Sequence, residues 1–260
     1  MPQFAANLSM LFTELPFEQR FKAAAEAGFG GVEYLFPYAW PAQDIRRWLD
    51  ESSLEQVLFN LPPGDWEAGE RGIASHPSRV EEFRTGVEIA IDYARQLGCS
   101  RLNCLAGLKP AGIAADQCWE TLVSNLRWAA PRLADAGIQL CVEAINSRVD
   151  MPGFVLDSSH KAEQLIADVG EKNLFFQYDI YHMQIMEGDL SRTISRLLPM
   201  IGHIQFADNP GRHEPGTGEI RFDGIFDLLD SLGYAGWASA EYHPSGNTAN
   251  SLKWFHLLRS

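Results

Sequence analysis

The chain has 260 residues and a formal net charge of −13 at pH 7. An acidic chain without a cluster of lysines and arginines is a poor candidate for binding a nucleic-acid backbone or an anionic membrane surface. No apolar run approaches the ~20 residues of a membrane span, and the first basic residue is Arg20, so no secretory signal is expected. The acidic charge does not exclude a small anionic substrate, provided that a local cation offsets it.

The four cysteines form no Cys-x-x-Cys pair. Cys104 and Cys141 fall in expected strands, where a cysteine usually acts as a small buried apolar residue. This usage favours a reduced, cytoplasmic setting.

Apolar runs of strand length alternate with helical patterns along the whole chain. Strands are expected at 4–11, 31–36, 54–61, 101–107, 138–145, 174–182, 201–208 and 236–243. Helices are expected at 16–27, 43–53, 79–98, 116–136, 158–169, 189–198, 222–232 and about 248–258. Gly28, Gly98 and Gly233 follow three of these helices as C-terminal stops. The segment Asp157-Ser158-Ser159 supplies N-cap oxygens for the fifth.

Strict alternation of eight strands with eight helices predicts an α/β fold, a single (β/α)8 TIM barrel domain over residues 1–260. The structural alternative is an open, doubly wound sheet. No expected strand is followed by a G-x-G-x-x-G turn, which disfavours that alternative.

Polar residues stand near the ends of the last four expected strands: Glu143, Asp179, Gln205 and Glu241. Strand side chains alternate between two faces, and in all four strands this polar residue shares a face with other small or polar side chains. In a barrel that face is the interior, and its C-terminal end is the usual place of an active site. Three carboxylates and an amide oxygen are suitable ligands for Mg²⁺ or Mn²⁺.

Such a cation would leave positions for two adjacent substrate oxygens, as in an α-hydroxycarbonyl compound. Glu143 and Glu241 could then remove and return a proton on neighbouring carbons through an enediolate. A single acidic residue at a strand end is more often a cap or loop anchor, so the prediction depends on four residues with matching parity. Glu33 ends the second strand in a similar way, but no comparable partners are evident and it is left out.

Three further residues are candidates for substrate binding. His182 follows Asp179 by three positions and could hydrogen-bond a substrate oxygen, although a lone histidine there is usually structural. Arg212, after the seventh strand, could pair with a substrate carboxylate, the alternative being an exposed loop arginine. Lys109, after the fourth strand, is a weaker candidate for the same role.

Several long stretches resemble the hydroxypyruvate isomerase family of xylose-isomerase-like TIM barrels. They are FAANLSMLF (4–12), FNLPPGDWEAGERGIA (59–74), NCLAGLKPAG (103–112), FQYDIYHMQIMEGDL (176–190) and IQFADNPGRHEPGTGEI (204–220). The resemblance runs from residue 4 to about residue 243. It implies interconversion of hydroxypyruvate and tartronate semialdehyde, a small 2-oxo acid substrate, and a homo-oligomer of the kind that related barrels often form.

The resemblance also implies residue roles. Its two acid–base glutamates match Glu143 and Glu241, and the metal positions of related barrels match Glu143, Asp179, Gln205 and Glu241. A histidine and an arginine that contact substrate oxygens match His182 and Arg212.

Two residues of this chain differ from those expected in related isomerases and epimerases, and they bear on which substrate the resemblance implies. Ketose 3-epimerases typically have histidine where this chain has Gln205, which disfavours the epimerase alternative. His243 stands where lysine is expected, so a 2-oxo-tetronate isomerase remains an alternative.

An endonuclease-IV-like DNA repair barrel would need more histidine and aspartate ligands and a basic groove. A non-catalytic sugar-acid binding barrel is disfavoured because both glutamates are present.

Overall fold

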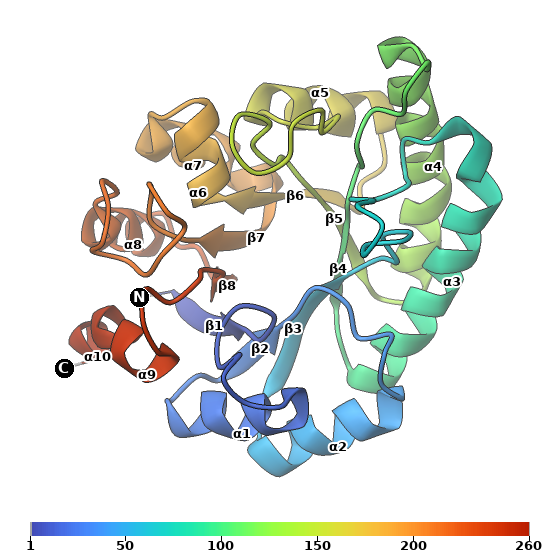
Figure 1. The fold of residues 1–260 in the computed structure, drawn as a ribbon. Helices are drawn as coiled ribbons and strands as arrows, with labels where there is room; N and C mark the ends of the chain where they lie inside the picture. Colours follow the sequence, from blue (N-terminus) through green and yellow to red (C-terminus); the bar gives the residue numbers. More distant parts are fainter. Residues whose placement is uncertain (1, 260) are drawn as a thin grey trace.

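A computed structural model describes residues 2–259. Eight parallel strands follow one another around a closed barrel in chain order, with β1 beside β8 (Figure 1). The strands are β1 (Gln3–Asn7), β2 (Gly31–Glu33), β3 (Glu55–Asn60), β4 (Arg101–Cys104), β5 (Gln139–Glu143), β6 (Leu174–Asp179), β7 (Ile201–Phe206) and β8 (Trp237–Ala240). The predicted (β/α)8 fold is confirmed.

Helices surround the barrel (Figure 1). They are α1 (Phe17–Glu26), α2 (Ala42–Ser52), α3 (Val80–Leu97), α4 (Ala115–Asp135), α5 (Ser159–Val169), α6 (Ile180–Met186), α7 (Leu190–Leu197), α8 (Phe222–Ser231), α9 (Thr248–Ser251) and α10 (Lys253–Arg259), with short 3₁₀ turns η1 (Pro77–Arg79) and η2 (Leu198–Met200). The N-cap predicted within 157–159 is confirmed, and the capping residue is Ser158, whose side chain accepts from the Lys161 N–H. No helix within residues 2–259 is long and apolar enough to cross a bilayer.

The strands are shorter than the sequence predicts, and most predicted C-terminal ends were wrong by several residues. The apolar runs continue past the sheet because the residues after each strand are also buried. The clearest case is 174–182, where the strand stops at Asp179 and α6 begins at Ile180. Asp179 accepts hydrogen bonds from the N–H groups of Tyr181 and His182, which is the geometry of a helix N-cap.

The register confirms the predicted parity. Glu143 lies opposite Gln177, and Asp179 lies opposite Gln205. The pairing of β6 with β7 shifts between Phe176 and Gln177, which leaves Gly202 as an extra residue. This bulge-like irregularity keeps the polar side chains of both strands on one face. The outward residues, including Leu140 and Ile204, are fully buried under the helices.

The interior of the barrel is unusually polar toward its C-terminal end. Barrel interiors are commonly filled by branched apolar side chains, but here buried polar residues project inward from most strands. They are Asn7, Glu33, Asn60, Asn103, Glu143, Gln177, Asp179, His203, Gln205 and Glu241. Most buried polar groups in proteins are hydrogen-bonded, so side chains of this set are expected to pair with one another.

Candidate active site

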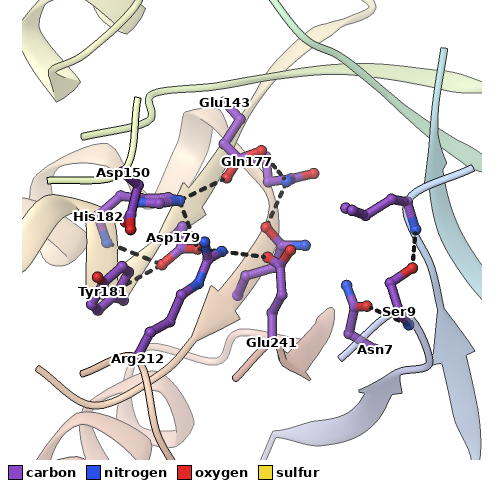
Figure 2. Close-up of polar contacts among 12 residues, drawn as sticks. Asn7, Ser9, Glu143, Asp150, Gln177, Asp179, Tyr181, His182, Arg212 and Glu241 are labelled. Carbon is purple, nitrogen blue, oxygen red and sulfur yellow. Dashed lines mark hydrogen bonds and ion pairs between the residues drawn. The ribbon is translucent and has the colours of Figure 1, made fainter. Parts of the chain in front are cut away.

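The four predicted strand-end residues converge at the C-terminal end of the barrel. Figure 2 shows three of them, Glu143, Asp179 and Glu241, around one point. Glu143 and Asp179 end their strands, Gln205 is next to last in β7, and Glu241 directly follows β8. Each is at most 5% exposed. The sequence therefore located this cluster correctly, because parallel strands bring their carboxyl ends to one rim.

Asp179 lies at the centre of the cluster. Its Oδ1 accepts from the N–H groups of Tyr181 (2.7 Å) and His182 (3.2 Å). Its Oδ2 is buried and has no hydrogen-bond donor in the described part of the chain. One oxygen therefore holds the start of α6, and the other is directed at the site.

Arg212 is the cation nearest to these carboxylates. Its Nη2 lies 3.7 Å from Oδ2 of Asp179 and 3.6 Å from Oε2 of Glu241. The guanidinium also lies over the ring of Tyr181, 5.2 Å from its centroid. The side chain is 14% exposed, so Arg212 is part of the site and not an exposed loop residue.

Glu143 is fixed through one of its two oxygens. Its Oε2 accepts from the amide groups of Gln177 (2.9 Å) and Asn103 (3.2 Å). Its Oε1 faces His182, whose Nε2 lies 3.7 Å away. The carboxylate is therefore oriented with one oxygen toward the site.

The tautomer of His182 follows from its neighbour Asn146. The Oδ1 of Asn146 accepts from the N–H groups of Val149 and Asp150, both at 2.9 Å, so its amide nitrogen faces His182. That nitrogen lies 2.7 Å from Nδ1 of His182 and has to donate to it. The proton of the neutral ring is therefore on Nε2, which lies 3.6 Å from Oδ2 of Asp179. His182 thus presents a donor to the site.

The expectation that Glu33 has no comparable partners was wrong. It is fully buried, and its Oε2 lies 2.7 Å from Nε2 of His203. Its Oε1 accepts from Asn7 (3.0 Å) and from Nε2 of Gln205 (2.7 Å). These partners are on β1 and β7, far from Glu33 in the chain, so no local sequence pattern predicts the contacts.

These contacts fix the amide of Gln205. Since its nitrogen donates to Glu33, its Oε1 faces the opposite side, where it accepts from Gln177 at 2.6 Å. Gln177 donates to both Gln205 and Glu143. A continuous hydrogen-bonded chain thus links Glu33 to Glu143 across the barrel.

Burial and charge shift the acidity of the site residues. Burial raises the pKa of Glu143 well above its ordinary value, and the charges of Glu241 and Asp179 add to this. Burial also raises the pKa of Glu241, against the opposing effect of Arg212. Burial raises the pKa of Asp179 to about 6. Elevated values of this kind are common where carboxylates serve as acids or bases.

The pKa values of His182 and Arg212 shift in opposite directions. Burial, then the charge of Arg212, lowers the pKa of His182 well below its ordinary value, so the ring is neutral. Burial alone would lower the pKa of Arg212, but Glu241 and Asp179 hold it above its ordinary value.

The cluster suits a hard divalent cation. Oδ2 of Asp179 and Oε2 of Glu241 are both buried without a hydrogen-bond donor among the described residues. Ligand atoms of Glu143, Asp179 and His182 lie within 4.8 Å of one another. Since the proton on Nε2 of His182 blocks that nitrogen, we favour the carboxylates as ligands over the histidine.

A family model described as xylose isomerase-like TIM barrel matches residues 21–258. The chain belongs to this family. It is 51% identical over 259 residues to the hydroxypyruvate isomerase of Escherichia coli (strain K12), with 100% of both chains covered. It is 45% identical over 254 residues to a 2-oxo-tetronate isomerase of Cupriavidus necator, covering 98% of this chain and 97% of the relative.

Among solved structures, one from Brucella melitensis, described as an AP endonuclease of family 2, matches with a TM-score of 0.97. It is 47% identical and covers 100% of both chains. The curated relatives are named isomerases, and this xylose isomerase-like chain is an isomerase.

Lys109 lies apart from the cluster in this xylose isomerase-like barrel. Its side chain is exposed and its Nζ donates to the carbonyl of Ile113 at 3.3 Å. It lines a separate surface hollow of about 470 Å³ together with Trp119 and Lys161. The structure brings His182 and Arg212 into the site, but not Lys109.

Proposed function

We propose that this isomerase interconverts hydroxypyruvate and tartronate semialdehyde, with Glu143 and Glu241 as the two proton-transfer groups. The observation that carries the proposal is a pair of buried glutamates connected through Asp179. His182 lies within 3.7 Å of both Glu143 and Asp179, and Arg212 lies within 3.7 Å of both Asp179 and Glu241. The 51% identity to the hydroxypyruvate isomerase of Escherichia coli supports the choice of substrate.

Both glutamates suit the chemistry. A carboxylate with a raised pKa is a stronger base than an exposed one, and its protonated form still delivers a proton near neutral pH. Burial is the largest cause of the raised pKa at Glu143 and at Glu241. Water exclusion at these side chains therefore prepares them for proton transfer at carbon.

The proposed reaction moves two protons and no other atoms. One glutamate takes a proton from C3 of hydroxypyruvate, and the electron pair that is left behind forms an enediolate. The second glutamate gives a proton to C2, and the hydroxyl proton passes from O3 to O2. Proton exchange with solvent then returns both glutamates to their starting states. The product has an aldehyde at C3 and a hydroxyl at C2, and the carboxylate keeps its charge.

The neighbouring side chains would hold the substrate oxygens. Nε2–H of His182 is a donor directed at the site, and it can hydrogen-bond the enediolate oxygens as negative charge develops on them. Arg212 supplies a positive charge in a buried setting, and its Nε has no acceptor within the described residues. It is the proposed partner for the substrate anion.

A divalent cation, Mg²⁺ or Mn²⁺, would be held by Glu143, Asp179 and Glu241 with the amide oxygen of Gln205. When bound, it would polarise the substrate carbonyl and favour loss of the adjacent proton. Activity after chelation, with elemental analysis of the purified protein, tests whether the enzyme depends on it.

A four-carbon 2-oxo acid is the second candidate substrate, because several relatives that are 40–45% identical are named 2-oxo-tetronate isomerases. Steady-state assays with both substrates separate the candidates. A higher kcat/KM for hydroxypyruvate is expected, and a higher value for 2-oxo-tetronate would reverse the assignment.

We propose a small molecule as the substrate in preference to nucleic acid. The site gathers three carboxylates around one arginine, and the whole chain carries a net charge of −13. Both features repel a phosphate backbone. Binding of abasic DNA at moderate salt would contradict this assignment.

A further inference from the structure

The loop that carries Arg212 is closed around a buried carboxylate, that of Asp208. Asp208 follows β7 by two residues and is fully buried. Its Oδ1 accepts from the N–H groups of Asn209 (2.9 Å) and Ile220 (3.0 Å). Its Oδ2 accepts from the N–H groups of Gly216 (2.9 Å) and Gly218 (2.8 Å). One carboxylate thereby ties together the two ends of the segment 208–220.

The backbone of the segment is shaped around this carboxylate. A Cβ atom at Gly218 would lie 2.2 Å from the carbonyl oxygen of Asn209 and 2.6 Å from Oδ1 of Asp208. Gly216 has a φ of +92°, which favours glycine. The N–H of Asp208 also donates to the carbonyl of His213 at 2.8 Å. The loop is therefore closed tightly and has little room to rearrange while Asp208 is in place.

The closed loop is also attached to the segment after β8. The carbonyl of Arg212 accepts from the N–H of His243 at 2.8 Å, and Nδ1 of His213 donates to the carbonyl of His243 at 2.7 Å. Glu214 accepts from the N–H and the hydroxyl of Ser245. Arg212 itself has a φ of +56°, a conformation that a non-glycine residue keeps only when its surroundings impose it.

We propose that Asp208 is a positioning residue that locks the 208–220 loop and so holds the Arg212 guanidinium against Asp179 and Glu241. Asp208 touches no reacting atom; it acts through the arginine. The catalytic consequence rests on the proposed function, whereas the effect on the loop does not.

Asp208→Asn is the primary test, because it preserves size and removes one acceptor. The new NH₂ group would face two backbone N–H groups, so two of the four hydrogen bonds are lost. Under native conditions, we expect trypsin to cleave the Arg212–His213 bond at least about tenfold faster than in the wild type, since exposed mobile loops are preferred sites of nicking. We also expect kcat/KM to fall about 10–100-fold, the scale of a misplaced catalytic group.

Glu219→Gln is the matched control. Glu219 is on the same loop, but it is exposed and accepts from the side-chain amides of Gln184 and Asn209. Cleavage at Arg212 and kcat/KM should both stay within about twofold of the wild type, as for most surface substitutions. An unchanged cleavage rate in Asp208→Asn would overturn the proposal.

A double variant tests whether Asp208 acts through Arg212. If it does, Asp208→Asn combined with Arg212→Ala loses no more activity than Arg212→Ala alone, because coupled residues are not additive. Losses that multiply would overturn the assignment.

Should Asp208→Asn fail to fold, Gly218→Ala opens the same loop sterically and should give the same cleavage and kinetic pattern. If the wild type turns over neither substrate, the proposed function fails, but the cleavage result still decides the role of Asp208.

Discussion

Nε2 of Gln205 donates a 2.7 Å hydrogen bond to Oε1 of Glu33, and this contact decides which end of the amide faces the active site. The oxygen of Gln205 is thereby directed toward Gln177 and the carboxylate cluster. The other oxygen of Glu33, Oε2, lies 2.7 Å from Nε2 of His203. Burial alone would raise the pKa of Glu33, but His203 and the hydrogen bond from Gln205 hold it below its ordinary value.

We expect Glu33→Ala to cost about 3–5 kcal/mol of unfolding free energy, because it leaves buried His203 and the two amides without their acceptor. Urea titration followed by circular dichroism measures this. Glu163→Ala is the control: Glu163 pairs with Arg196 at 2.6 Å on the surface and should cost less than about 1 kcal/mol. Equal losses in the two variants would mean that the Glu33 network contributes no special stability.

Glu143→Gln should lower turnover by about 10²–10⁴-fold, the usual contribution of a general acid or base. The variant keeps the oxygen that accepts from Gln177 and Asn103, so near-UV circular dichroism should be unchanged. Glu241→Gln should behave in the same way, and Glu163→Gln should retain full activity. A Glu143→Gln enzyme with wild-type turnover would rule out the proposed proton transfer.

Without metal, Glu143→Gln should gain stability relative to the wild type as pH rises. The folded-state pKa of Glu143 is above its unfolded value near 4.5, so the wild type holds an extra proton and loses stability when that proton leaves. The amide never ionises. Each pKa unit is worth about 1.4 kcal/mol, or roughly 3–6 °C in a domain of this size.

Thermal unfolding of both proteins in chelator, from pH 5 to pH 8, measures the difference in Tm. The difference should be small at pH 5 and should grow with pH. A difference that shrinks over this range would contradict a raised pKa at Glu143.

Substitutions of His182 and Asp179 should have different effects on the affinity for a divalent cation. His182→Gln should change the Mn²⁺ dissociation constant by less than about threefold, because the Nε2 proton makes His182 a donor and not a ligand. Asp179→Asn should weaken binding by about tenfold or more, since it removes a charged oxygen ligand. Calorimetric titration of Mn²⁺ measures both, with no need for turnover. A large loss in His182→Gln would assign the histidine as a ligand.

The alternation of strands and helices and the four strand-end residues could be predicted from the sequence. Both follow from local periodicity: side chains two apart share a face, and parallel strands deliver their ends to one rim. The positions of His182 after Asp179 and of Arg212 after the seventh strand placed both at the same rim, and the family resemblance implies substrate contacts for them. The structure brings both beside Asp179.

Only the tertiary structure decided the network behind these residues. Glu33 and His203 are 170 positions apart and meet because β1 closes the barrel against β8 and brings β2 near β7. Glu33 likewise sets the orientation of the Gln205 amide, and Asn146 sets the tautomer of His182. Periodicity indicates which face a side chain occupies, but not which buried group lies across the barrel to pair with it.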